Sequence, residues 1–95
     1  MKILALEHDL SSQSIEHAAE LKEEARCVWQ LYQSGIIREV YFRGDRAEAV
    51  LMLECKDPGE ARRILDTLPL VRSGLIDFEI IPLAPYPGFG RLFSQ

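Results

Sequence analysis

The stretch IIREVYFRGDRAEAVLMLEC, residues 36–55, decides the fold of this chain. Residues 36–43 are rich in β-branched and aromatic side chains, and residues 47–55 are apolar with alternating acids. Both compositions are typical of β-strands. Between them, Arg43-Gly44-Asp45-Arg46 has the glycine and aspartate that tight turns favour. The stretch therefore predicts a β-hairpin.

A helix is predicted on each side of this hairpin, over residues 13–34 and 58–68. In the first helix, apolar residues recur at intervals of three and four: Ala18, Leu21, Ala25, Val28 and Tyr32. Gly35 follows, where a left-handed residue commonly ends a helix. Asp57-Pro58-Gly59-Glu60 predicts the start of the second helix, because it supplies a capping aspartate, a proline for the first helical position and a glutamate in the first turn.

Two outer strands complete the pattern, at residues 2–7 and 75–83. The order strand, helix, strand, strand, helix, strand predicts an α+β domain of the ferredoxin-like βαββαβ type, in which an antiparallel sheet carries both helices on one face. The whole chain, residues 1–95, is predicted to be this one domain. Residues 84–95 form an extended C-terminal tail with prolines, glycines and embedded aromatic residues.

Both faces of the hairpin are apolar in part. Strict alternation places Arg38, Val40 and Phe42 on one face of their strand, and Ile37 and Tyr41 on the other. Because the helices cover only one face of the sheet, the other face needs a partner. We therefore expect a homodimer or higher homo-oligomer that pairs through the sheets, with the C-terminal tail packed on the partner subunit.

Composition and charge narrow the classes of partner. The 95 residues are 47% hydrophobic, with no apolar run long enough to cross a bilayer and no signal-peptide pattern. The net charge is −4, and the basic residues are scattered among acidic ones, which disfavours nucleic-acid binding. Cys27 and Cys55 lack the spacing of a disulfide framework and indicate reduced thiols. We expect a cytoplasmic protein that binds neither nucleic acid nor membrane.

Four short motifs, which together span most of the chain, resemble a known family. They are Leu21-Lys22, Gly35 with Arg38 three residues later, Leu68-Pro69-Leu70 and Asp77-Phe78-Glu79-Ile80. The chain resembles the muconolactone isomerase family, a member of the dimeric α/β-barrel superfamily. The resemblance implies ferredoxin-like subunits whose sheets pair into a barrel. It also implies an enzyme that moves a proton on a lactone without metal or cofactor.

A proton shuttle on a lactone needs a base near the acidic carbon and a donor or cation that stabilises the enolate. The candidate catalytic residues are Lys22, Arg38, Tyr41 and His8. Lys22 lies at the edge of the apolar helix face and belongs to a motif of the resemblance. His8 follows the first strand, and its ordinary pKa suits proton transfer near neutral pH. We expect a cleft between sheet and helices that is lined by Lys22 and Arg38 together with Tyr41 or His8, with no cofactor and no metal.

Each candidate also has a structural interpretation. Lys22 is explained equally well as a lysine whose aliphatic stem covers apolar surface while its charge reaches water. Arg38 lies among apolar strand neighbours and is explained by an ion pair with Asp77 or Glu79, within the subunit or across a dimer. The neighbouring acids Glu23 and Glu24 are interpreted as a solvated helix face.

Three functions stay open at this point. The first is the isomerase-like enzyme, acting on a lactone or related small organic acid. The second is a noncatalytic oligomeric module for small-molecule binding or assembly, which needs the two-faced sheet and the apolar tail but no proton relay. The third is a cofactorless oxygenase of the same superfamily, which would consume oxygen on an aromatic substrate.

Overall fold

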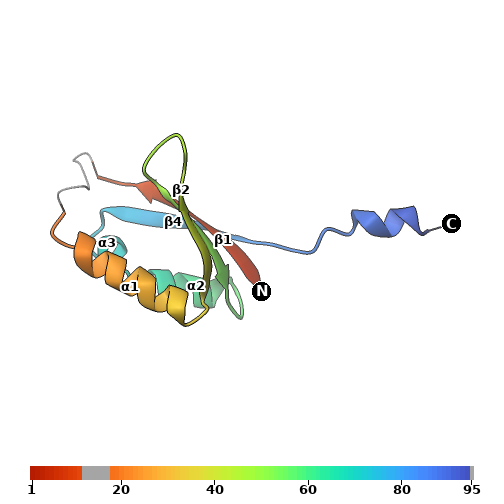
Figure 1. Cartoon of the computed structure of the whole chain (residues 1–95), viewed down its shortest axis with the longest axis horizontal. Helices are drawn as coiled ribbons and strands as arrows, with labels where there is room; N and C mark the ends of the chain where they lie inside the picture. Colours follow the sequence, from red (N-terminus) through yellow and green to blue (C-terminus); the bar gives the residue numbers. More distant parts are fainter. Residues whose placement is uncertain (12–17, 95) are drawn as a thin grey trace.

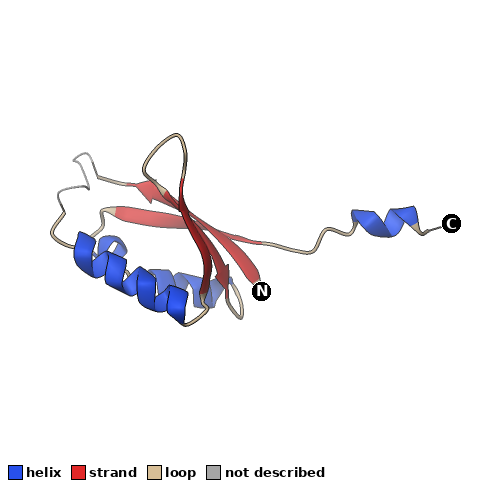
Figure 2. Cartoon of the chain, in the orientation of Figure 1, coloured by secondary structure: helices blue, strands red, loops and turns tan. Residues whose placement is uncertain are grey.

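The computed structural model describes residues 1–11 and 18–94. Its elements, in chain order, are β1 (Lys2–Asp9), α1 (Leu21–Gln33), β2 (Ile37–Phe42), β3 (Ala49–Glu54), α2 (Pro58–Leu65), α3 (Pro69–Arg72), β4 (Ile76–Pro82) and the 3₁₀ helix η2 (Gly88–Leu92). The four strands form one antiparallel sheet in the order β2-β3-β1-β4, with the helices on one face (Figures 1 and 2). The predicted α+β, ferredoxin-like fold is confirmed.

The hydrophobic core lies between the sheet and the helices. Alternate residues of β1 and β3 point into it, and Ile3 lies opposite Leu53 while Ala5 lies opposite Leu51. The helices contribute buried side chains through α2, α3 and the segment between them: Ala61, Leu65, Leu68 and Leu70. Each fully buried leucine or isoleucine stabilises the fold by roughly 1.5–3 kcal/mol. Of the helices in the described part of the chain, none has the length and hydrophobicity needed to cross a bilayer.

The second predicted helix ends earlier than residue 68. Its start is as predicted, because Asp57 Oδ1 accepts a hydrogen bond of 2.8 Å from the backbone N–H of Glu60. Its end is set by Pro69, because a residue that precedes proline is disfavoured in the helical region. Leu68 accordingly has extended backbone angles, φ −69° and ψ 135°. The helix therefore stops at Leu65, and a separate short helix, α3, begins at the proline.

The first predicted helix starts later than residue 13. Residues 12–17 lie outside the described residues, and residues 18–20 form a turn in which Leu21 N–H donates to the carbonyl of Ala18. Ala18 packs against the core from this turn, so its burial does not reflect helical periodicity. The predicted end is correct. Gly35 has φ +85°, a left-handed conformation that glycine adopts without steric cost.

A β-bulge in β2 corrects the predicted strand faces. The pairing with β3 shifts between Ile37 and Glu39, which makes Arg38 an extra residue in the ladder. Ile37 and Val40 both lie opposite buried leucines, so they share the helix-facing side. Strict alternation had placed Ile37 with Tyr41, on the opposite face. The extra residue of a bulge resets the alternation by one position.

The sheet face opposite the helices has an apolar centre. Its half-buried side chains, here called the free face, are Leu4, Leu6, Val50, Met52 and Ile81. No helix of the described chain covers them, since all the helices of the domain lie on the other side (Figure 1). The predicted sheet-to-sheet homodimer would cover this face, and it stays a prediction.

The C-terminal segment, residues 84–94, runs away from the domain as an arm (Figure 1). It was predicted to be extended throughout, but Gly88–Leu92 forms the 3₁₀ helix η2. The ring of Tyr86 packs edge-on against Phe89, with 5.1 Å between centroids. The Tyr86 ring lies so close to Gly88 that a β-carbon there would collide with it. The glycine thus permits the ring contact that compacts the arm.

Candidate functional site

A cleft of about 460 Å³ lies between α1 and the sheet. It is called here the helix–sheet cleft. Apolar side chains form most of its wall: Leu21, Val28, Val40, Leu51, Leu70 and Phe78. The cleft exists because α1 contributes no fully buried residue, so this helix covers the sheet loosely. Two carboxylates, Glu7 and Glu24, interrupt the apolar wall.

Glu7 occupies the core-facing side of β1, next in the alternation after Ile3 and Ala5. It is only 9% exposed and is the one buried charged residue in the described chain. Burial raises the pKa of its carboxyl, because the charged form loses hydration. The backbone N–H of Ala49 acts in the opposite direction, and the nearby carboxylate of Glu48 adds to the increase. The result is a carboxyl group whose proton is held more tightly than usual.

Glu24 is half-buried on α1 and has a structural partner. Its Oε1 accepts a hydrogen bond of 3.0 Å from the backbone N–H of Leu70, in the first turn of α3. Burial raises its pKa, and this hydrogen bond opposes the increase. The interpretation of Glu24 as part of a solvated helix face is therefore corrected, because its side chain joins two helices beside the cleft.

A second hollow, of about 490 Å³, lies beside the edge strand β2 and is called here the edge groove. One wall comes from α1, where Trp29 and Tyr32 stack with ring centroids 6.0 Å apart. The other wall comes from β2, through Arg38 and Tyr41. Ala25, Val28 and Val40 line both hollows, so the edge groove adjoins the helix–sheet cleft.

The structure separates the four predicted catalytic residues. Arg38 and Tyr41 line the edge groove, where Arg38 Nε donates to the carbonyl of Gly35 and Tyr41 Oη donates to Glu39 at 2.8 Å. That bond to a carboxylate raises the pKa of Tyr41. Lys22 is exposed on the first turn of α1 and is not among the residues that line the two described hollows. Arg38 and Tyr41 therefore share one hollow, whereas Lys22, which was predicted to share a cleft with Arg38, does not line it.

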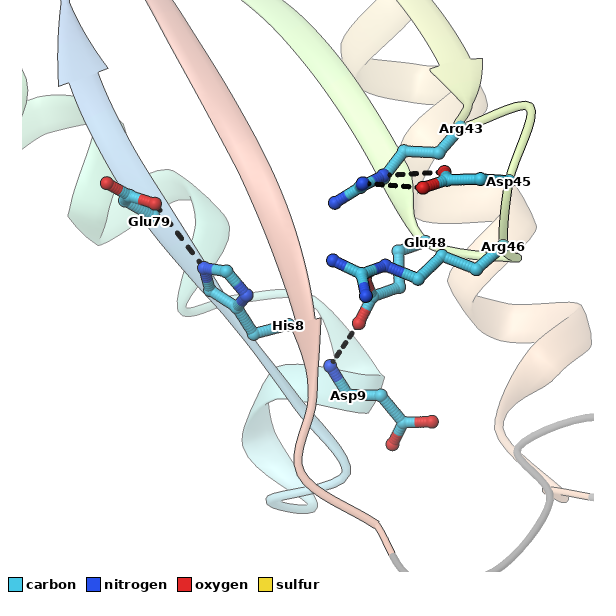
Figure 3. Close-up of polar contacts among 7 residues, drawn as sticks. All are labelled: His8, Asp9, Arg43, Asp45, Arg46, Glu48 and Glu79. Atoms are coloured by element: carbon cyan, nitrogen blue, oxygen red, sulfur yellow. Dashed lines mark hydrogen bonds and ion pairs between the residues drawn. The ribbon is translucent and has the colours of Figure 1, made fainter.

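His8 lies on the side of the sheet away from the helices. Its Nε2 is 3.4 Å from Oε1 of Glu79 on the neighbouring strand β4 (Figure 3). Asp77, also on β4, pairs with Arg62 of α2 at 2.8 Å. An ion pair between Arg38 and either acid was expected within the subunit or across a dimer. Within the subunit it does not form, because β2 and β4 are the opposite edges of the sheet, and the pair across a dimer stays a prediction.

Ionic contacts fix the end of β1, just beyond Glu7, to the hairpin loop (Figure 3). The backbone N–H of Asp9 donates to Glu48 Oε2 at 2.9 Å, and Arg46 Nε lies 2.6 Å from the other oxygen of Glu48. Within the loop, Arg43 binds Asp45 through two hydrogen bonds of 2.8 and 2.9 Å. The bond from Asp9 is the largest cause of the lowered pKa of Glu48. These contacts hold the polar end of the cleft in place.

Glu7 and Glu24 were not among the predicted site residues. For Glu7 the sequence held a usable signal, because a charged residue on the core side of an apolar strand is costly unless it has a purpose. For Glu24 the partner is 46 residues away in the chain, so no local pattern reveals it.

The lining of the helix–sheet cleft limits the ligands that fit it. It contains two carboxylates and no arginine, lysine or histidine among the described residues. No group of three or more metal-ligating side chains is gathered anywhere in residues 1–11 and 18–94. A neutral, largely apolar molecule suits this chemistry better than an anion held wholly inside. Comparison with protein-family models finds no match to this chain, and comparison with curated proteins finds none either.

Proposed function

We propose that this protein is a small cofactor-independent enzyme that moves a proton on a lactone or related small organic molecule, with Glu7 as its base. The observation that carries the proposal is a buried carboxyl group facing an apolar cleft of about 460 Å³. This volume is within the range of small-molecule sites in proteins. The resemblance to the muconolactone isomerase family supports the same class of reaction.

The proposed reaction needs one group that both takes and returns a proton. The Glu7 carboxylate removes a proton from the carbon beside the lactone carbonyl, and the electron pair of that C–H bond moves onto the carbonyl oxygen as an enolate. The resulting carboxylic acid then returns the proton to a different carbon of the conjugated system, and the carbonyl re-forms. A carboxyl whose pKa is raised toward the working pH is suited to both steps.

Arg38 is proposed to receive the anionic end of a substrate that carries a carboxylate. It lines the edge groove, which adjoins the helix–sheet cleft along Ala25, Val28 and Val40. The reacting ring would lie near Glu7, and its acidic substituent would extend toward the guanidinium. A guanidinium is well matched to a carboxylate because it offers two parallel N–H donors.

The direct test is to incubate the purified protein with muconolactone and simple butenolides in deuterated water. Nuclear magnetic resonance then measures deuterium uptake at the acidic carbon, and ultraviolet absorbance follows migration of the double bond. Glu7→Gln should lower the rate by about 100-fold or more. Glu23→Gln is the matched control, because it makes the same change on an exposed side chain that pairs with Arg26. Full activity of Glu7→Gln would reject the proposed base.

The second candidate function is a noncatalytic oligomeric module that binds a small apolar molecule. It is favoured by the free face and by the arm, neither of which a proton-transfer site requires. In the same experiment, this function would give saturable shifts of ligand resonances without deuterium uptake in any lactone. Both candidate functions are proposed for a cytoplasmic homo-oligomer, and the free thiols of Cys27 and Cys55 are consistent with a reducing compartment.

A further inference from the structure

The edge groove has the chemistry of a surface that binds proline-rich segments. Trp29 is 57% exposed, and it continues the aromatic wall formed with Tyr32 and, across the groove, Tyr41. Grooves lined by aromatic side chains recognise extended polyproline II segments, because the preformed backbone loses little entropy on binding. Exposed aromatic surface of this kind also marks interaction sites in general.

The chain carries a matching segment in its own C-terminal arm. Residues 82–87 read Pro-Leu-Ala-Pro-Tyr-Pro, of which Pro82 belongs to β4 and pairs with Ile3, so Pro85, Tyr86 and Pro87 are the part beyond the sheet. The sheet holds this segment only as far as Leu83, whose N–H donates to the carbonyl of Lys2 at 3.0 Å. Beyond that point the arm presents large exposed side chains: Tyr86, Phe89, Leu92 and Phe93.

The position of the arm indicates which groove it meets. It leaves the sheet from β4, one edge strand, whereas the edge groove lies beside β2, the other edge strand. It also runs outward and does not turn back toward its own domain (Figure 1). A second copy of the chain presents the same groove to this outstretched arm.

We propose that the edge groove of one copy binds the C-terminal arm of a second copy, with Pro85-Tyr86-Pro87 against the aromatic wall. Each copy is then both a donor of an arm and an acceptor. The contact is heterologous, since arm and groove are different surfaces, and it closes into a dimer or ring only where the symmetry permits. The contact uses the same groove in which Arg38 is proposed to receive a substrate carboxylate, whereas Glu7 lies in the adjoining helix–sheet cleft.

The structure provides its own reporter for this contact. Trp29 is the only tryptophan in the chain, and it lies in the wall of the groove. Docking of an arm should remove water from its indole ring and shift its emission to shorter wavelength. In the full-length protein, this shift should grow with protein concentration, in parallel with the mass measured by sedimentation equilibrium.

Two full-length variants separate the two halves of the contact. The double substitution Tyr86→Ser with Phe89→Ser disables the arm, and Tyr32→Lys disables the groove. The control is Leu10→Ser, which removes an exposed apolar side chain elsewhere. Circular dichroism checks that the variants retain the fold.

The arm variant should show no concentration-dependent emission shift, and the control should behave as the natural sequence does. An equimolar mixture of the arm and groove variants should restore the shift, because one intact arm and one intact groove remain. A shift that persists at concentrations where the protein sediments as a monomer would mean that the arm binds its own groove, and would overturn the proposal. So would a self-associating protein whose Trp29 emission stays unshifted, since its copies would meet elsewhere, as through the free face.

Discussion

Replacing Glu7 with leucine is expected to raise the free energy of unfolding at pH 7. The carboxyl is 9% exposed and faces apolar side chains, with the backbone N–H of Ala49 as a compensating group. Replacing a buried polar group whose hydrogen bonds are only partly satisfied with an apolar one raises the free energy of unfolding by about 1–3 kcal/mol. For a domain of this size, a gain of 1 kcal/mol corresponds to an increase of roughly 4–8 °C in Tm. A residue kept for chemistry at the expense of stability should behave in this way.

The stabilisation by Glu7→Leu should increase as the pH rises. The pKa of Glu7 is raised in the folded protein above its ordinary value of 4.5. Below that value, both the folded and the unfolded chain carry the proton, and the buried charge costs nothing. As the pH rises from 4.5 through the folded pKa, the unfolded chain loses its proton first, so the stability of the natural protein falls. The advantage of Glu7→Leu is therefore smaller at pH 4 than at pH 7.

Urea unfolding followed by circular dichroism, at pH 4 and pH 7 and at one fixed protein concentration, measures both quantities. Glu7→Gln is the companion variant, because it removes the charge and keeps the shape. A Glu7→Leu protein that is less stable than the natural one at pH 7 would refute the reasoning. A stability difference that is the same at both pH values would refute the role assigned to the buried charge.

Two further predictions concern single hydrogen bonds. Glu24→Ala removes the acceptor for Leu70 N–H and should lower the free energy of unfolding by about 1–2 kcal/mol. The control Glu23→Ala, on the exposed side of α1, should lower it by under about 0.5 kcal/mol. Equal effects of the two substitutions in urea titrations would contradict the bridge between helices. Asp57→Ala removes the cap at Glu60 N–H and should lower the free energy of unfolding by about 1 kcal/mol, whereas Asp57→Asn should keep most of that stability. Thermal denaturation measures both variants. An unchanged Tm for Asp57→Ala would show that the cap contributes nothing.

The parts of the fold that the sequence predicts are those with a local cause. Asp57 caps the start of α2 and Pro58 occupies its first position. Gly35 follows the end of α1 because glycine adopts a positive φ without steric cost. The strands follow from short runs of β-branched and apolar residues. Together these local signals give the element order, and the order restricts the sheet to very few topologies.

The features that local patterns did not predict depend on distant partners. The bulge at Arg38 comes from how β2 pairs with β3, and it reverses the face assigned to Ile37. The cleft exists because α1 covers the sheet without burying a side chain fully, which no periodicity reveals. Lys22 was grouped with Arg38 because both belong to motifs of the resemblance, and His8 was added for its place after the first strand and its ordinary pKa. In the structure Lys22 is exposed on the first turn of α1, His8 lies on the sheet side away from the helices, and Arg38 lines the edge groove.

The loose cover that α1 gives the sheet has a dynamic consequence. The helix packs on the core through half-buried side chains such as Val28 and Leu31, so its outward movement uncovers less apolar surface than global unfolding does and should cost less free energy. The fully buried side chains of the core come from α2, α3, the strands and the segments that join them, and none comes from α1. Entry of a molecule to the helix–sheet cleft therefore requires no melting of the core. Outward movement of α1 is therefore the route that this packing offers for entry to the cleft.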